Sequence, residues 1–138
     1  MLEKIDHIGI VVKNIDESLK LYKKAFGLDP IKTEFIEETK LKIAFVKVGE
    51  VLVEFVEPME AGFGMVGRFL VEKGEGIHHI AYRVANIRAA MEKMKKAGIP
   101  LTDEEPQYGA DDSSIAFLEA SYTQNVVTEL VQRKREIK

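Results

Sequence analysis

The sequence predicts an α+β fold built from two tandem βαβββ modules. Three observations favour it: the chain repeats itself, each repeat combines strand-like segments with one amphipathic helix, and both repeats carry the same polar residues at the same places. The 138 residues, of which 46% are hydrophobic, suit one compact unit with a well-filled core. We therefore expect a single domain over residues 1–138, with module one at about 4–58, a linker helix at about 63–74 and module two at about 76–133.

The repeat is visible when the two halves are aligned at a shift of 72 positions. At that shift, residues 43–45 and 115–117 both read Ile-Ala-Phe. After a three-residue insertion the shift becomes 75, and segment 51–56 aligns with segment 126–131. Matches that keep one order along both halves indicate a duplicated unit.

Each half is expected to contain a strand, a helix and three further strands. In the first helix, Ile15, Leu19 and Tyr22 follow the spacing i, i+4, i+7 and form one apolar stripe. Asn14 or Asp16 can cap the start of this helix. The expected strands lie near 4–12, 30–37, 42–48, 51–57, 77–84, 100–105, 114–119 and 126–133, and the expected helices near 16–26 and 87–97.

Two pairs of polar residues occupy equivalent positions in the repeat. Glu54 and Glu129 each lie in an aliphatic strand, where an unpaired buried carboxylate is costly, and His7 and His79 lie in the first strand of each half. Two neutral imidazoles and two carboxylates balance the charge of a divalent cation. We therefore expect His7, Glu54, His79 and Glu129 to hold one divalent metal ion, in a cavity enclosed by the curled mixed sheets of the two modules. His78 would point to the other strand face and is the alternative to His79.

Composition argues against several classes of function. The net charge of −3, with mixed signs, argues against a nucleic-acid-binding surface. No apolar run reaches the roughly 18 residues of a membrane span, and the N-terminus lacks the apolar core of a signal peptide; we expect a cytoplasmic protein. The absence of cysteine excludes disulfides and thiol chemistry. Residues 133–138 are expected to form a charged tail without a role in the core.

At these residues the chain resembles the vicinal oxygen chelate superfamily (glyoxalase/bleomycin resistance/dioxygenase), whose members pair βαβββ modules around a metal. Within it, the likeness is closest to the methylmalonyl-CoA epimerases and covers nearly all of 4–133. The most specific stretch is 74–79, Gly-Glu-Gly-Ile-His-His. Other matching stretches are 5–10, 53–58, 103–106 and 128–130.

The resemblance implies a metal-dependent epimerase that interconverts the 2-epimers of methylmalonyl-CoA, by α-proton transfer through a metal-stabilised enolate. It carries the family's metal ligands onto His7, Glu54, His79 and Glu129, and it makes Glu129 the expected catalytic base. Oxygen and nitrogen ligands of this kind fit Co, Ni, Mn, Fe or Zn. A small-molecule acyl-CoA substrate and a homodimer are further implications of the resemblance.

The sequence also departs from the epimerase pattern. Segment 41–44 lacks the glutamate that some epimerases use as a second proton-transfer group, which leaves Lys42, Glu37 or Glu119 as candidates. Loop 109–112 reads Gly-Ala-Asp-Asp where the family usually has Gly-Ala-His-Gly. Two alternatives stay open: a glyoxalase-I-like lactoylglutathione lyase with the same ligand set, and a metal-free small-molecule-binding resistance protein.

Overall fold

The computed structural model describes residues 1–137 and confirms the predicted α+β class. Its elements follow one another as two βαβββ series joined by a helix, with a short 3-10 helix, η1 (Ala120–Tyr122), before the last strand. The first series is β1 (Leu2–Val11), α1 (Ile15–Phe26), β2 (Pro30–Ile36), β3 (Leu41–Val48) and β4 (Val51–Pro58). After α2 (Gly64–Lys73), the second series is β5 (Gly76–Val84), α3 (Ile87–Lys96), β6 (Gln107–Gly109), β7 (Ser113–Phe117) and β8 (Val127–Gln132).

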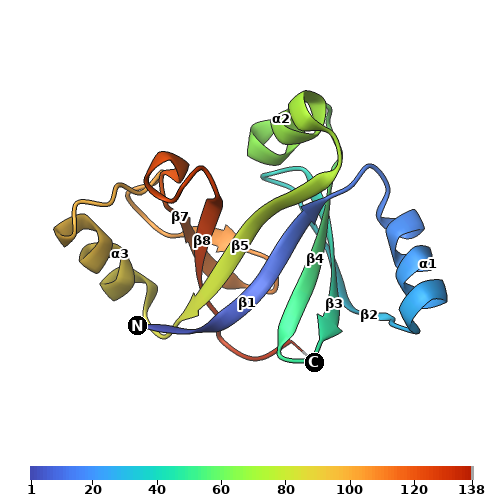
Figure 1. Cartoon of the computed structure of the whole chain (residues 1–138), viewed down its shortest axis with the longest axis horizontal. Helices are drawn as coiled ribbons and strands as arrows, with labels where there is room; N and C mark the ends of the chain where they lie inside the picture. The colour runs from blue at the N-terminus through green and yellow to red at the C-terminus, as the bar shows by residue number, and fades with distance from the viewer. Residues whose placement is uncertain (138) are drawn as a thin grey trace. The chain divides into compact units, whose positions relative to one another are not determined.

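The strands are hydrogen-bonded in the order β2-β3-β4-β1-β5-β8-β7-β6 (Figure 1). β5 pairs with β8 in parallel, whereas β2 with β3, β3 with β4, β6 with β7 and β7 with β8 are antiparallel. The sheet is therefore mixed, as the sequence predicts. Corresponding strands of the two series occupy corresponding places in this order, which is the structural counterpart of the sequence repeat.

The chain divides into two compact units. The first consists of residues 1–7 and 79–136, and the second consists of residues 8–78 with Ile137. Strands β1 and β5 each contribute residues to both units, so the units differ from the sequence modules. The assignment of a single domain stays a prediction.

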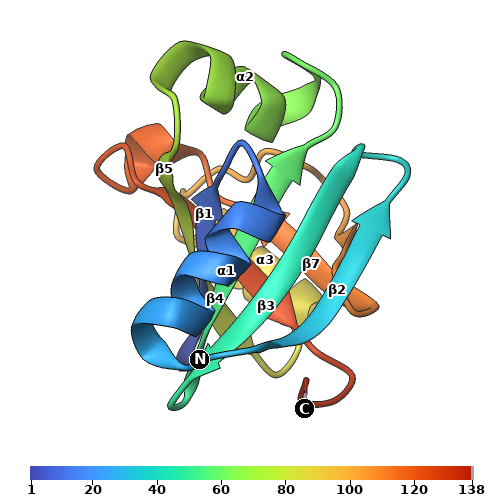
Figure 2. The ribbon, with the colours of Figure 1, turned by 90° about the vertical axis from the view of Figure 1, so that its right-hand side faces the viewer.

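In the second unit, helix α1 packs on strands β3 and β4 (Figure 2). The side chain of Asn14 accepts a hydrogen bond from the Glu17 N–H, so Asn14, and not Asp16, is the cap of the two predicted candidates. The backbone N–H of Ile15 donates to Glu57 Oε1 at 2.9 Å, which ties the start of α1 to β4. The apolar cluster under the helix contains Val12, Ile15, Ala44, Val46 and Phe55.

In the first unit, helix α3 packs on β7 and β8 in the same manner. Asn86 caps it by accepting from the Ala89 N–H, and the Ile87 N–H donates to Gln132 Oε1 at 2.8 Å. The repeat therefore reproduces the cap and the tether to the last strand. The apolar cluster contains Val84, Ile87, Ala90, Met91, Ala116, Leu118 and Leu130.

The expected strand over 100–105 is wrong. The structure has β6 at Gln107–Gly109, and Leu101 makes only an isolated bridge to Leu118. Pro100 is the first residue of the expected segment and Pro106 follows its last residue, and proline offers no N–H to a strand ladder. Every other expected helix or strand begins and ends within two residues of the observed one.

Within residues 1–137, no helix is both long enough and apolar enough to span a bilayer.

Candidate metal centre

The two glutamates of the repeat occupy the same position in their strand pairs. Glu54 on β4 lies opposite Phe45 on β3, and Glu129 on β8 lies opposite Phe117 on β7. Both are buried, with 6% of Glu54 and 3% of Glu129 exposed. The face of β4 that carries Glu54 is buried at residues 52, 54 and 56, and β8 is buried on both faces from residue 128 to residue 131.

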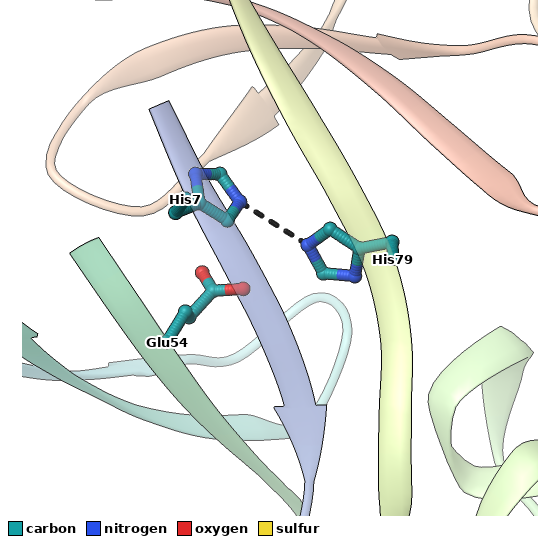
Figure 3. Close-up of side chains that lie close together, drawn as sticks. All are labelled: His7, Glu54 and His79. Carbon is teal, nitrogen blue, oxygen red and sulfur yellow. Dashed lines mark hydrogen bonds between the residues drawn. The ribbon is translucent and has the colours of Figure 1, made fainter. Parts of the chain in front are cut away.

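In the first unit, two histidines and one of these glutamates converge. His7 Nε2 lies 3.1 Å from His79 Nε2, and a hydrogen bond joins the two rings (Figure 3). The Glu129 carboxylate reaches both rings, with Oε2 3.4 Å from His7 Nε2 and Oε1 3.5 Å from His79 Nε2. Three of the four predicted ligand side chains thus point their donor atoms at one another.

Glu54 belongs to a second grouping. His7, Glu54 and His79 are all buried, and each offers one ligand atom within 4.8 Å of those of the other two, so the three residues could hold a metal ion (Figure 3). His7 and His79 are common to this group and to the contacts of Glu129.

His78, the alternative to His79, has a different environment. Its ring packs edge-to-face on Phe69, with the centroids 5.0 Å apart. It is not a member of the group that could hold a metal. Because successive side chains of a strand point to opposite faces, the neighbour that joins His7 is His79.

Asp6 determines which nitrogen of His7 is available to a metal. His7 Nδ1 lies 2.7 Å from Asp6 Oδ1, and a carboxylate can only accept, so Nδ1 carries the proton. The Nε2 atom of His7 is then the nitrogen that presents a lone pair toward His79 and Glu129. His79 Nε2–H is the donor to that lone pair, and a bound cation would replace its proton.

Asp6 is held as an anion by two arginines. Burial by itself raises the pKa of Asp6, but the hydrogen bonds from His7 and Arg133 and the charge of Arg133 outweigh it and hold that pKa well below its usual value. Arg83 adds a further ion pair, with Nη2 2.9 Å from Asp6 Oδ2. Asp6 is therefore an ionised carboxylate that accepts the Nδ1–H of His7 and so orients the imidazole ring.

The sequence pattern did not identify these supporting residues. Asp6 sits between Ile5 and His7, next to a candidate metal ligand, and a buried carboxylate needs partners, so its position was an available signal. The expectation that the tail makes no contribution to the core is wrong for Arg133, whose side chain is 3% exposed, and for Ile137, a buried core residue. The last residue of that tail, Lys138, lies outside the described residues.

The candidates for a second proton-transfer group lie elsewhere. Lys42 Nζ is 3.6 Å from Asp16 Oδ1, on the first turn of α1. Glu37 and Glu119 are exposed. None of the three belongs to the described group that could hold a metal.

The donor set fits a divalent cation. Two neutral imidazoles and two carboxylates supply hard and borderline ligands with a total charge opposite to that of the ion. In the first unit, His7 Nε2 lies 3.1 Å from His79 Nε2, and the Glu129 carboxylate oxygens lie 3.4 Å and 3.5 Å from these two nitrogens. The chemistry of these donors selects no single metal among Co, Ni, Mn, Fe and Zn.

Paired βαβββ modules with buried histidine and glutamate donors define a class of metal-chelating folds. The chain belongs to the Glyoxalase/Bleomycin resistance protein/Dioxygenase superfamily, whose family model matches residues 6–117.

The chain is similar to proteins that include epimerases and a lyase. A variant of Streptomyces coelicolor methylmalonyl-CoA epimerase in complex with 2-nitronate-propionyl-CoA superposes with a TM-score of 0.92 and 31% identity, covering 98% of this chain and 100% of that chain. The human mitochondrial methylmalonyl-CoA epimerase is 28% identical over 131 residues, which are 95% of this chain and 74% of that protein. The lactoylglutathione lyase of Escherichia coli O157:H7 is 30% identical over 113 residues, 82% of each chain.

Proposed function

We propose that this chain is a methylmalonyl-CoA epimerase, an isomerase that interconverts the two configurations at carbon 2 of methylmalonyl-CoA. The observation that carries the proposal is the match, along nearly the whole chain, to an epimerase bound to a propionyl-CoA derivative. The buried histidine and glutamate donors of β1, β5 and β8 supply the chemistry that such a reaction needs. The substrate is therefore a small acyl-CoA thioester.

The reaction begins with removal of the proton on the carbon between the thioester and the carboxylate. A divalent metal ion would be held by His7, Glu54, His79 and Glu129. These ligands are compatible with Co, Ni, Mn, Fe or Zn. When bound, such an ion acts as a Lewis acid for the negative charge that develops on the thioester oxygen.

Glu129 is the residue we assign as the base. Glu129 as a residue is 3% exposed and lies opposite Phe117 in the strand pairing, so little water competes for its carboxylate. The carboxylate takes the α-proton, and the resulting enolate is planar at carbon 2. Delivery of a proton that originates from solvent water to the opposite face of that plane completes the epimerisation, and Glu129 then releases the proton it took to solvent.

The test is to offer (2S)-methylmalonyl-CoA to the metal-loaded protein in deuterated water. The expected result is epimerisation with deuterium incorporation at carbon 2, which mass spectrometry and NMR measure. Protein stripped with a chelator is the control, and it is expected to regain activity when one of the candidate metals is returned. Absence of both exchange and epimerisation would overturn the proposal.

A glyoxalase-I-like lactoylglutathione lyase is the second candidate. The specific observation in its favour is the 30% identity to the Escherichia coli O157:H7 lyase over most of both chains. The same four ligands and the same enolate chemistry would serve a hemithioacetal. Turnover of the methylglyoxal–glutathione adduct, without exchange in methylmalonyl-CoA, would decide for the lyase.

The expected homodimer and cytoplasmic location also remain proposals. Light scattering on the purified metal-loaded protein measures the first directly, with a mass near twice 15.6 kDa expected.

A further inference from the structure

The charged segment 133–136 is tied to the first unit at each of its residues. Four consecutive side chains each form an ion pair with a different partner of opposite charge. The pairs are Arg133 with Asp6, Lys134 with Asp112, Arg135 with Asp111 and Glu136 with Arg83. These four contacts attach the segment to the unit, and only the first of them is buried on both sides.

The Arg133 pair is the buried one. Its guanidinium spans the Asp6 carboxylate, with Nη2 donating to Oδ1 at 2.7 Å and Nε donating to Oδ2 at 2.9 Å. The Arg133 and Asp6 side chains are 3% and 0% exposed. A two-point contact of this kind fixes the plane of a carboxylate as well as its position.

The oxygen atoms of Asp6 are held by different partners. Oδ1, which accepts the His7 Nδ1–H, also receives Arg133. Arg83 meets Asp6 at Oδ2, to which its Nε and Nη2 atoms each lie at 2.9 Å. Of the two arginines, Arg133 is thus the one whose described contacts reach the oxygen that orients the imidazole.

We propose that Arg133 is a positioning residue for the metal centre: it fixes Asp6, Asp6 fixes the ring of His7, and Arg133 thereby raises the metal affinity of the site. This inference rests on the metal site of the proposed function. An imidazole whose second nitrogen is anchored keeps its ligand atom directed, and loss of such an outer partner typically weakens metal binding about 10–100-fold. Without this anchor, the His7 ring could rotate about its Cβ–Cγ bond, and its Nε2 atom would no longer be held toward the metal.

The experiment measures Co²⁺ binding, because Co²⁺ reports on its ligand geometry by visible absorption. Three full-length variants are compared with the unmodified protein: Arg133→Gln, the conservative Arg133→Lys, and Arg135→Gln as the matched control. Arg135 belongs to the same segment but pairs with Asp111 instead of Asp6. For each variant, the dissociation constant is measured by chelator competition, the Co²⁺ spectrum is recorded, and the unfolding temperature is measured without metal.

Arg133→Gln is expected to weaken Co²⁺ binding by about tenfold or more and to alter the Co²⁺ spectrum. Arg133→Lys keeps the charge but not the two-point contact, so an intermediate affinity is expected. Arg135→Gln is expected to stay within about twofold of the unmodified protein, since it leaves the contacts from Arg133 through Asp6 to His7 intact. A purely structural role would lower the metal-free unfolding temperature and leave the spectrum unchanged.

Two results would overturn the inference. One is a folded Arg133→Gln variant with the Co²⁺ affinity and spectrum of the unmodified protein. If that variant does not fold, Asp6→Asn, which keeps an acceptor for His7 but loses the arginine pair, carries the same expectation and the same refutation. The other is failure of the unmodified protein to bind Co²⁺, which contradicts the proposed function itself, and with it the inference.

Discussion

Glu129 lies directly opposite Phe117 in the antiparallel pairing of β7 with β8. The Phe117 ring also meets the ring of His79, with the centroids 6.0 Å apart. An acid and an imidazole that share an aromatic neighbour in the interior are shielded from water, which strengthens every electrostatic interaction they make. The paired carboxylate and rings are therefore suited to hold a cation and to move a proton.

Replacing Glu129 with glutamine tests its role as the base. The amide preserves the size of the side chain but cannot accept a proton, so α-proton exchange is expected to fall by about 10²–10⁴-fold. Deuterium incorporation into methylmalonyl-CoA, at saturating metal, measures the effect. Glu104→Gln, at an exposed position in the first unit, is the control and should exchange normally. An exchange rate within about tenfold of the unmodified protein in Glu129→Gln would falsify the assignment.

Metal binding is expected to stabilise the fold. A ligand that binds only the native state at about 100 times its Kd adds about 2.7 kcal/mol to the free energy of unfolding. Urea denaturation of the stripped protein, with and without added Co²⁺, measures this gain.

Removal of the Glu54 carboxylate should reduce that gain. Each tenfold loss of affinity in Glu54→Leu lowers it by about 1.4 kcal/mol at a fixed metal concentration. Leucine is chosen because it offers no ligand atom, whereas the amide oxygen of glutamine could still bind the ion. The same urea titrations, run on this variant, give the comparison. If Glu54→Leu keeps the full gain, Glu54 is not a ligand.

The duplicated helix caps are expected to contribute equally. Asn14 and Asn86 each accept a backbone hydrogen bond at 3.0 Å, from Glu17 and Ala89 respectively. Replacing either with alanine should cost about 1 kcal/mol, measured by urea denaturation. Glu92→Ala, at an exposed position inside α3, is the control and should change stability by less than about 0.5 kcal/mol. A cost confined to one of the two caps would contradict the equivalence.

Gly109 is expected to tolerate no side chain. A Cβ at this position would lie 2.5 Å from Ser113 Oγ and 2.6 Å from Ile115 Cγ2, so Gly109→Ala should destabilise the protein by about 1–3 kcal/mol. Thermal unfolding measures the loss. Ser113→Ala added to Gly109→Ala removes the nearer obstacle and should restore part of the stability; an unchanged unfolding temperature in Gly109→Ala would contradict the expectation.

The duplicated features could be predicted from the sequence because each half provides a check on the other. The aligned positions of Glu54 and Glu129 are reproduced as equivalent strand positions opposite equivalent aromatic residues. The two asparagine caps follow from the same alignment. The strand expected at 100–105 had no such support, because the second half offered only an acidic run between two prolines there.

The supporting contacts of the candidate site could not be predicted in this way. Asp6 and Arg133 are 127 positions apart in the chain, and Asp6 has no acidic counterpart at the repeat position 78. A long-range ion pair leaves no periodic pattern in a sequence. Only the fold, which returns the chain to β1 after β8, brings the two residues together.

The strand order β2-β3-β4-β1-β5-β8-β7-β6 has a consequence for the origin of the chain. From each end of the sheet toward its middle, the second, third, fourth and first strands of one module follow one another. The first strands of the two modules, β1 and β5, are therefore neighbours at the middle. A half-length ancestor that self-associated through its opening strand would have produced this succession without any covalent connection. Fusion of two such genes would then have freed each copy to diverge, so that one half could acquire the arginines that now brace the aspartate of the other.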